Sequence, residues 1–119
     1  MFREGDLRFF ERLDPDIDWW IPETLPDGGS RHGESEVIDF WEAMGELFEG
    51  AHPDPEEFIP AGDRLIVLGT WRARVKATGD LVEARFAHVN GYRDGKLVSF
   101  RNYIDTAKVL QALEGQPGT

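Results

Sequence analysis

The chain of 119 residues is 40% hydrophobic and 12% aromatic, a composition typical of one globular domain and not of a disordered chain. Its 13 basic and 23 acidic residues give a net charge of −10, which argues against nucleic acid as a partner because phosphate binding needs Lys and Arg. There is no cysteine, which excludes disulfides, thiolate metal sites and a cysteine nucleophile. Because no apolar run approaches the roughly 20 residues of a membrane span and the N-terminus is charged, we expect a cytoplasmic protein without a membrane segment.

The first third of the chain is predicted to hold a helix, a strand and a loop. Apolar residues three apart predict a short helix over residues 6–13, which ends before Pro15 because proline restricts the residue that precedes it. The aromatic segment at residues 16–22 predicts a strand. Residues 23–33 are rich in Gly, Pro, Asp and Ser, and they predict a loop.

The main helix is predicted over residues 35–49. Its apolar residues recur at the spacing of one broad helical face, and they are Val37, Ile38, Phe40, Trp41, Met44, Leu47 and Phe48. Acidic residues suit its N-terminus, and Gly50 suits its C-terminal end. The segment HPDPEE at residues 52–57 is predicted to be neither helix nor strand, because two prolines interrupt it.

From residue 58 onward the pattern changes to strands joined by Gly-containing turns, as in an antiparallel meander. The predicted strands are residues 58–62, 63–78, 81–93 and 96–105. A short helix is expected at 106–113, and the tail 114–119 is expected to be disordered, so that 1–113 forms the single domain. This order predicts an α+β fold, in which a curved sheet covers the main helix and its concave face can enclose a pocket.

Alternation along the last three strands places two sets of side chains on opposite faces of the sheet. The predicted inner set is Gly69, Trp71, Ala73, Ala84, Phe86, His88, Phe100, Asn102 and Ile104. The outer set includes Arg72, Arg74, Arg85, Arg101 and Tyr103, which suits a solvated or dimer-forming surface. The inner face therefore combines aromatic and small residues with hydrogen-bonding side chains.

Four segments, in this order, resemble the nuclear transport factor 2 superfamily in its SnoaL-like and ketosteroid isomerase-like branch. They are REGDLRFFERLDPDIDWWIP, RHGESEVIDFWEAM, AGDRLIVLGTWRARVKATGD and HVNGYRDGKLVSFRNYIDTAKVL, and together they cover almost all of the chain. The resemblance implies a cone-shaped, strongly curved antiparallel sheet wrapped around helices, with a largely apolar cavity open at one end. Many members of the superfamily are dimers, so a homodimer is expected.

The N-terminus departs from the family pattern. A first helix of about a dozen residues or more precedes the REGDL-type segment in the family, whereas only Met1 and Phe2 precede it here. The first helix is therefore expected to be missing or shortened. A family tyrosine that helps form an oxyanion hole in the isomerases lies on that helix, so its role is not transferred to this chain.

His88 is the only histidine in a strongly predicted strand, and an imidazole that faces a pocket can act as a general acid or base. The alternative is a core histidine satisfied by one hydrogen bond. Asn102 lies fourteen residues later on the same face. In the SnoaL-like cyclases a His and an Asp in a similar relation perform acid/base chemistry, whereas the Asn of this chain cannot take a proton.

Two mechanisms known from relatives are disfavoured by the residues at matching positions. In the limonene epoxide hydrolases an Asp lies in a WRDYFD-like segment, which reads FRNYID here with Asn102 in its place. The Arg and Asp partners of that Asp would align near Gly69 and Trp71, and the isomerase base would fall near Ile21. Epoxide hydrolysis and steroid isomerisation by those mechanisms are not expected.

Four other polar residues are candidates for the site or for structural roles. Asp18 is the best remaining candidate for a carboxylate at the cavity mouth, and the alternative is a solvated aspartate at a strand end. Asp105 is expected to cap the last helix. His32 and His52 lie in loops and are expected at the surface. No spacing of His, Asp and Glu suggests a metal site, and no cofactor is expected.

The expected catalytic residues are therefore His88, Asn102 and Asp18. The expected pocket residues are Trp20, Trp41, Phe48, Trp71, Phe86, Phe100 and Ile104. The first functional hypothesis is an acid/base enzyme of the isomerase or cyclase type, in which His88 moves a proton and Asn102 orients the substrate. The alternatives are a module that binds a small hydrophobic cyclic or carbonyl compound without chemistry, and a structural dimer with a filled cavity.

Overall fold

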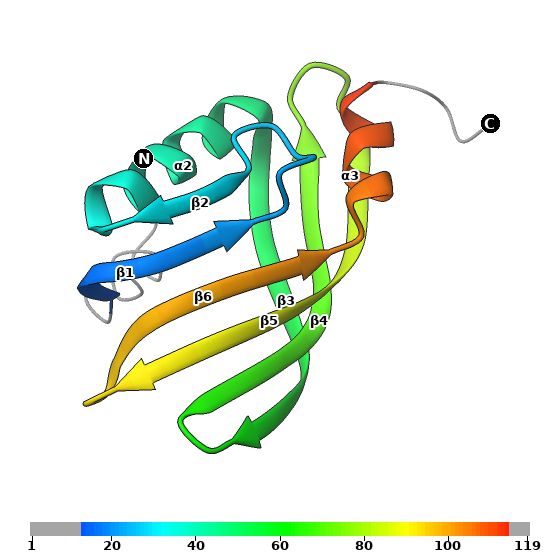
Figure 1. Ribbon diagram of the computed structural model, residues 1–119. Helices are drawn as coiled ribbons and strands as arrows, with labels where there is room; N and C mark the ends of the chain where they lie inside the picture. Colours follow the sequence, from blue (N-terminus) through cyan, green and yellow to red (C-terminus); the bar gives the residue numbers. More distant parts are fainter. Residues whose placement is uncertain (1–12, 115–119) are drawn as a thin grey trace.

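The structure, a computed structural model, describes residues 13–114, which form a curved sheet and two helices (Figure 1). The strands are β1 (Leu13–Ile21), β2 (Gly29–His32), β3 (Phe48–Ala61), β4 (Arg64–Val75), β5 (Leu81–Arg93) and β6 (Lys96–Ile104). The helices are α2 (Glu34–Leu47) and α3 (Thr106–Leu113). Three predictions fall wholly or largely outside the described residues: the helix at 6–13, the missing or shortened first helix, and the disordered tail after residue 114. Leu13, the last residue of that predicted helix, begins β1.

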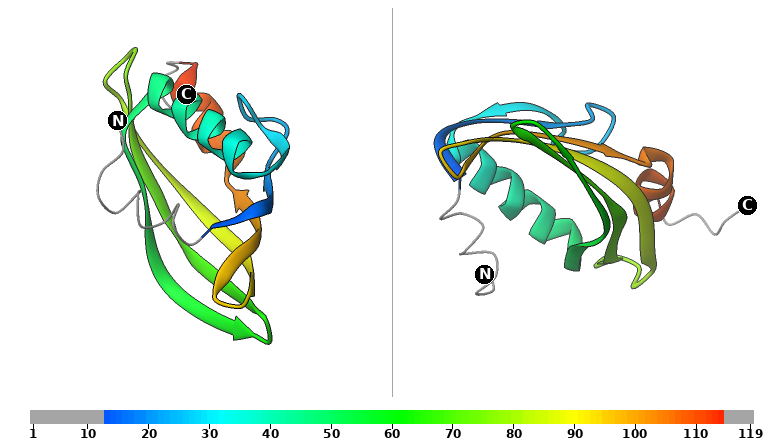
Figure 2. Two further views of the ribbon diagram at one scale, coloured as in Figure 1. Left: turned by 90° about the vertical axis from the view of Figure 1, so that its left-hand side faces the viewer. Right: turned by 90° about the horizontal axis from the view of Figure 1, so that it is seen from below.

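The six strands form one sheet in the order β2-β1-β6-β5-β4-β3. Neighbouring strands are antiparallel except β1 and β6, which run parallel. The sheet curves around α2, which lies along its concave side (Figure 2). The predicted α+β fold with a curved sheet around a helix is confirmed, whereas the parallel pair was not anticipated from the meander pattern.

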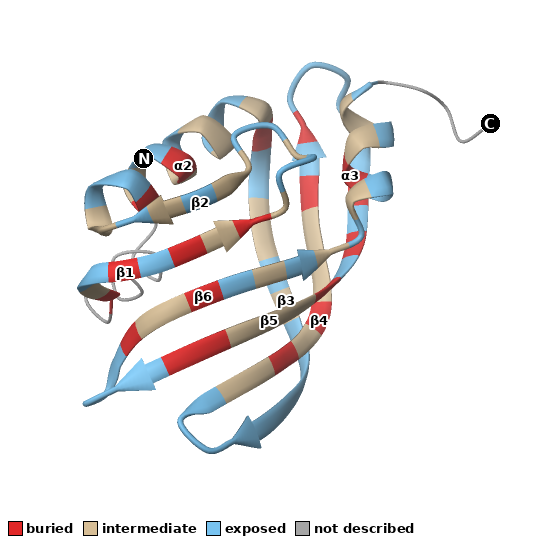
Figure 3. Ribbon diagram, in the orientation of Figure 1, coloured by how far each residue is buried: buried red, intermediate tan, exposed pale blue. Residues whose placement is uncertain are grey.

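The core fills the space between the sheet and the two helices. One cluster joins β1, α2 and β6, where the Trp19 ring stacks on Phe100 with 4.1 Å between ring centroids, and Val37 and Phe40 of α2 are buried. A second cluster joins β3, β4 and β5 to Val109 of α3. Buried and more exposed residues alternate along β4 and β5, as expected for a sheet with one covered face (Figure 3).

Strand pairing confirms the predicted inner face. Gly69 lies opposite Phe86, Trp71 opposite Ala84, and His88 opposite Asn102. The turn between β5 and β6 consists of Asp94 (φ 52°) and Gly95 (φ 77°). Two successive residues with positive φ make the tight hairpin turn that matches strand twist and fixes the register.

The prediction for the proline-rich segment 52–57 is wrong, because it lies inside β3. This strand is the edge of the sheet, so only one side of it pairs. Pro53, Pro55 and Pro60 face Trp71, Gly69 and Leu65 of β4, which are an even number of residues apart. Hydrogen-bonded and non-hydrogen-bonded pairs alternate along an antiparallel ladder, so all three prolines belong to the same one of these two kinds. Their nitrogens, which carry no hydrogen, can therefore all point away from β4.

Further differences from the predictions concern β2 and the end of α2. Residues 29–32, expected as loop, form β2 and pair with β1 from Asp18 to Ile21. The main helix ends at Leu47, because Phe48 takes an extended conformation and pairs with Val75 of β4. The predicted cap of the last helix is confirmed, since the Asp105 side chain accepts a hydrogen bond from the backbone N–H of Lys108.

Candidate functional site

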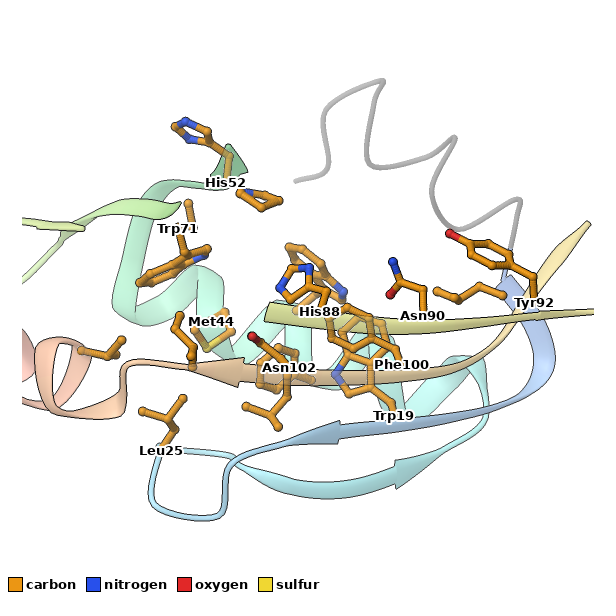
Figure 4. Close-up of a pocket in the computed structure, with 18 residues that line it drawn as sticks. Trp19, Leu25, Met44, His52, Trp71, His88, Asn90, Tyr92, Phe100 and Asn102 are labelled. Atoms are coloured by element: carbon orange, nitrogen blue, oxygen red, sulfur yellow. The ribbon is translucent and has the colours of Figure 1, made fainter. Parts of the chain in front are cut away.

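A pocket of about 340 Å³ lies between α2 and the inner face of the sheet (Figure 4). Its walls are mostly apolar and come from strands, helices and the loop after β1. They consist of Trp19, Ile21, Leu25, Phe40, Trp41, Met44, Ala51, His52, Pro53, Trp71, His88, Asn90, Tyr92, Leu97, Phe100, Asn102, Ile104 and Val109. The lining contains no Asp, Glu, Lys or Arg from the described part of the chain.

Six of the residues expected in the site line this pocket. They are His88, Asn102, Trp41, Trp71, Phe100 and Ile104. Phe86 and Phe48 lie behind the lining, where Phe86 stacks on the His88 ring at 4.0 Å and Phe48 packs edge-on against Trp71 at 5.0 Å. These two rings hold lining residues in place without forming the wall.

Trp20 lies on the other face of the sheet, and the structure places its neighbour Trp19 in the pocket wall instead. Trp20 packs on Tyr103 with 5.1 Å between ring centroids, and its indole N–H donates to a carboxylate oxygen of Glu23 at 2.6 Å. The sequence WW does not reveal which tryptophan faces inward. Pairing decides it, because Trp19 lies opposite Phe100, which faces inward, and Trp20 lies opposite Arg101, which faces outward.

Asp18 also lies outside the pocket lining. Its side chain is 77% exposed, and its carboxylate is 2.8 Å from Nδ1 of His32 on the neighbouring strand β2. This hydrogen bond, together with the charges of Asp18, Asp16 and Glu36, raises the pKa of His32 against a smaller effect of burial. The pair forms an exposed polar contact that fixes β2 against β1, and it does not bring a carboxylate to His88.

His88 projects from β5 into the pocket between two phenyl rings. Its imidazole stacks on Phe86 and meets Phe100 edge-on, with 4.8 Å between ring centroids. Burial against these rings lowers the pKa of His88 to about 4, because an apolar surrounding disfavours the charged imidazolium. The ring is therefore neutral at pH 7, with one nitrogen that donates a hydrogen bond and one that accepts.

Asn102 faces His88 directly across the β5–β6 pair. A side-chain interaction between them raises the pKa of His88, but less than burial lowers it. Asn102 is only weakly engaged, since its buried Oδ1 has no partner with full hydrogen-bond geometry among residues 13–114. The amide therefore remains able to contact a molecule in the pocket.

Asn90 is a further polar group on this wall, and it was not among the predicted site residues. It lies two residues after His88 on β5, is 9% exposed and lines the pocket. Its Oδ1 is buried and lacks a hydrogen-bond partner within the described chain. The same alternation that selected His88 also places Asn90 on the inner face, so the signal was present in the sequence.

His52 lies at the edge of the pocket, near the start of β3. Its side chain is 44% exposed, and Nδ1 is 2.8 Å from the backbone carbonyl oxygen of Gly50. Asp54, two residues after His52, accepts a hydrogen bond from Nε of Arg72 at 2.6 Å. Across residues 13–114 no three His, Asp or Glu side chains come together in an arrangement that could hold a metal ion.

A strongly curved sheet around one long helix, with an aromatic pocket between them, defines the class of cone-shaped α+β proteins typified by nuclear transport factor 2. The chain belongs to the SnoaL-like domain family, whose model matches residues 1–100. A comparison with curated proteins finds no match. Within the described residues, no helix has the length and apolar character needed to cross a membrane.

Solved structures support this assignment. An NTF2-like protein of unknown function from Burkholderia pseudomallei K96243 is 32% identical, with a TM-score of 0.81 over 87% of this chain and 81% of that one. TerC, co-crystallised with polyporic acid, is 25% identical, with a TM-score of 0.80 over 93% of this chain and 96% of that one. A ketosteroid isomerase-like protein from Catenulispora acidiphila DSM 44928, in complex with trimethylamine, shares the fold at 16% identity, with a TM-score of 0.79 over 91% and 80% of the two chains.

Proposed function

We propose that the protein binds a small hydrophobic cyclic or carbonyl compound in the pocket between α2 and the sheet. The observation that carries this proposal is the chemistry of the wall. Trp19, Trp41, Trp71 and Phe100 offer large apolar surfaces. The polar groups beside them are few, and they include the uncharged amides Asn90 and Asn102 and the neutral imidazole of His88. Apolar pockets with a few convergent polar groups are the usual form of small-molecule sites.

The volume and the similar structures suggest which compounds to test. A pocket of about 340 Å³ is at the lower end of the usual size range for ligand sites, which favours a compound of a few rings over a long chain. TerC was co-crystallised with polyporic acid, so polyporic acid is a natural first probe, followed by steroids, terpenoids and aromatic polyketides.

Binding is expected to raise the melting temperature of the protein and to depend on the open volume of the pocket. Met44 of α2 lines the pocket, and Met44→Trp adds ring volume there, so this variant is expected to lose at least nine-tenths of the affinity for the best probe. Ile59→Trp adds the same ring on β3, outside the pocket lining, at a residue that is 37% exposed, and it is the matched control. Thermal shift and titration calorimetry check both variants.

The proposal fails if no probe stabilises the wild-type protein. It also fails if Met44→Trp and Ile59→Trp bind the probe equally well, because the compound would then lie elsewhere on the molecule.

Acid/base catalysis at His88 is the second candidate function. The observation that favours it is a neutral imidazole in the pocket wall, which can accept a proton from a bound carbon or oxygen acid while Asn102 orients the compound. Its low pKa makes it a weak base, and the described lining offers no carboxylate to assist it. Binding without chemistry is therefore the function that the site supports better.

If His88 is the base, His88→Gln is expected to lower turnover by roughly 10²-fold or more while the affinity for the compound changes little. Because His88 is neutral well above a pKa of about 4, the rate is expected to be flat between pH 6 and pH 8. Steady-state kinetics on any compound that binds check both statements. Unchanged turnover in His88→Gln would leave binding as the function of the pocket.

A further inference from the structure

The side-chain amide of Asn90 is buried in the aromatic pocket wall, where its oxygen has no hydrogen-bond partner among the described residues. The residue is only 9% exposed, and its Oδ1 finds no hydrogen-bond partner within residues 13–114. Buried polar atoms in folded proteins are nearly always hydrogen-bonded, so an exception calls for an explanation. The pocket supplies one, because Asn90 is part of its lining and lies beside His88 (Figure 4).

The surroundings of Asn90 exclude a charged partner. Phe100 lies opposite it in the β5–β6 pair, and His88 lies two residues away on the same face, about 6.6 Å along the strand. No lysine, arginine or carboxylate from the described residues lines the pocket. A cation would lose its hydration without gaining a counter-ion, which is costly in an apolar site. An uncharged donor is therefore the partner that suits this amide oxygen best.

Among uncharged groups, a hydroxyl fits this amide best. An asparagine side chain carries both an acceptor oxygen and a donor nitrogen, and a hydroxyl can donate to the first and accept from the second. A ketone or ether oxygen only accepts, so it would leave the Asn90 oxygen unsatisfied. The hydroxyl therefore satisfies the site whichever way the amide is turned.

We infer that Asn90 is a ligand-binding residue that selects hydroxyl-bearing cyclic compounds, such as phenols, over their ether, ketone and unsubstituted counterparts. The inference rests on the proposed function, since the compound must first enter the pocket. It narrows the ligand class from hydrophobic cyclic compounds in general to those that present a hydrogen-bond donor toward β5, and it names the residue that makes the distinction.

The test compares three probes that share one ring system, namely 2-naphthol, 2-methoxynaphthalene and naphthalene. Titration calorimetry on the wild-type protein is expected to show 2-naphthol binding about tenfold tighter than the other two, the value of one hydrogen bond to a buried acceptor. In Asn90→Leu, which removes the amide and keeps an apolar side chain of similar size, this preference is expected to disappear. Tyr103→Phe removes a hydroxyl from the outer face and is expected to retain the preference.

The possible results distinguish a failure of this inference from a failure of the proposed function. If all three probes bind the wild-type protein with equal affinity, the proposed function stands and the inference is overturned. A preference for 2-naphthol that survives in Asn90→Leu also overturns it, because another residue would then be responsible. If none of the three binds although another compound does, the inference is overturned. If no compound binds at all, the proposed function fails and the inference fails with it. The wild-type comparison needs no variant, so the inference remains open to refutation even if Asn90→Leu does not fold.

Discussion

Replacing Gly69 by alanine is expected to destabilise the protein by about 3 kcal/mol, the upper part of the usual range for an overpacked core. A Cβ atom at this position would collide with the backbone carbonyl oxygen of Asp54 and come within 2.8 Å of Cζ of Phe86. Asp54 has little freedom to retreat, because Arg72 holds its carboxylate at 2.6 Å. Urea unfolding followed by circular dichroism measures the change.

Gly45→Ala is the matched control for that substitution. A Cβ at Gly45 would meet no atom within 4 Å, and the residue lies in the last turn of α2. Alanine is favoured over glycine in a helix by about 1 kcal/mol, so this variant is expected to be more stable than the wild-type protein. If Gly69→Ala is as stable as wild type, β3 does not approach β4 as closely as described.

The free energy of unfolding is expected to fall as the pH is lowered from 6.5 toward 4, in part because of His88. Its pKa is about 4 in the folded protein and close to 6.5 when unfolded. Between these values the unfolded chain binds more protons than the folded chain, so acid favours unfolding. The contribution is at most about 1.4 kcal/mol per pH unit, and solvent that reaches the half-buried ring reduces it. Above pH 6.5 it vanishes.

His88→Gln is expected to flatten the pH dependence of stability between pH 6.5 and 5, measured by urea unfolding at several pH values. Carboxylates titrate in both proteins, so the slope difference between wild type and variant isolates the imidazole. Equal slopes in the wild type and His88→Gln would contradict the burial of a neutral imidazole.

Sequence periodicity predicted the sheet and the main helix because those segments bury one regular face. Alternation along β4, β5 and β6 correctly placed Trp71, His88 and Asn102 on the inner side. The two-residue turn at Asp94 and Gly95 fixed the pairing of β5 with β6, so a local signal set a long-range register.

Features that depend on neighbouring strands were not predictable from the sequence alone. The proline-rich segment of β3 is tolerated only because one side of that strand is unpaired, which no local pattern reveals. Trp19 and Trp20 are adjacent and chemically identical, so their orientation follows from the pairing of β1 with β6. The position of Asp18 beside these tryptophans suggests a place in the site, but the same pairing turns its side chain outward.

The prolines of β3 also affect how readily another chain could add a strand to the sheet. An exposed sheet edge is a template on which another chain can add a strand, and repeated addition leads to fibrils. Three of the residues along this edge have no N–H to offer an incoming strand. The opposite edge is β2, which has only four residues. Both edges of the sheet are thus poor templates for strand addition.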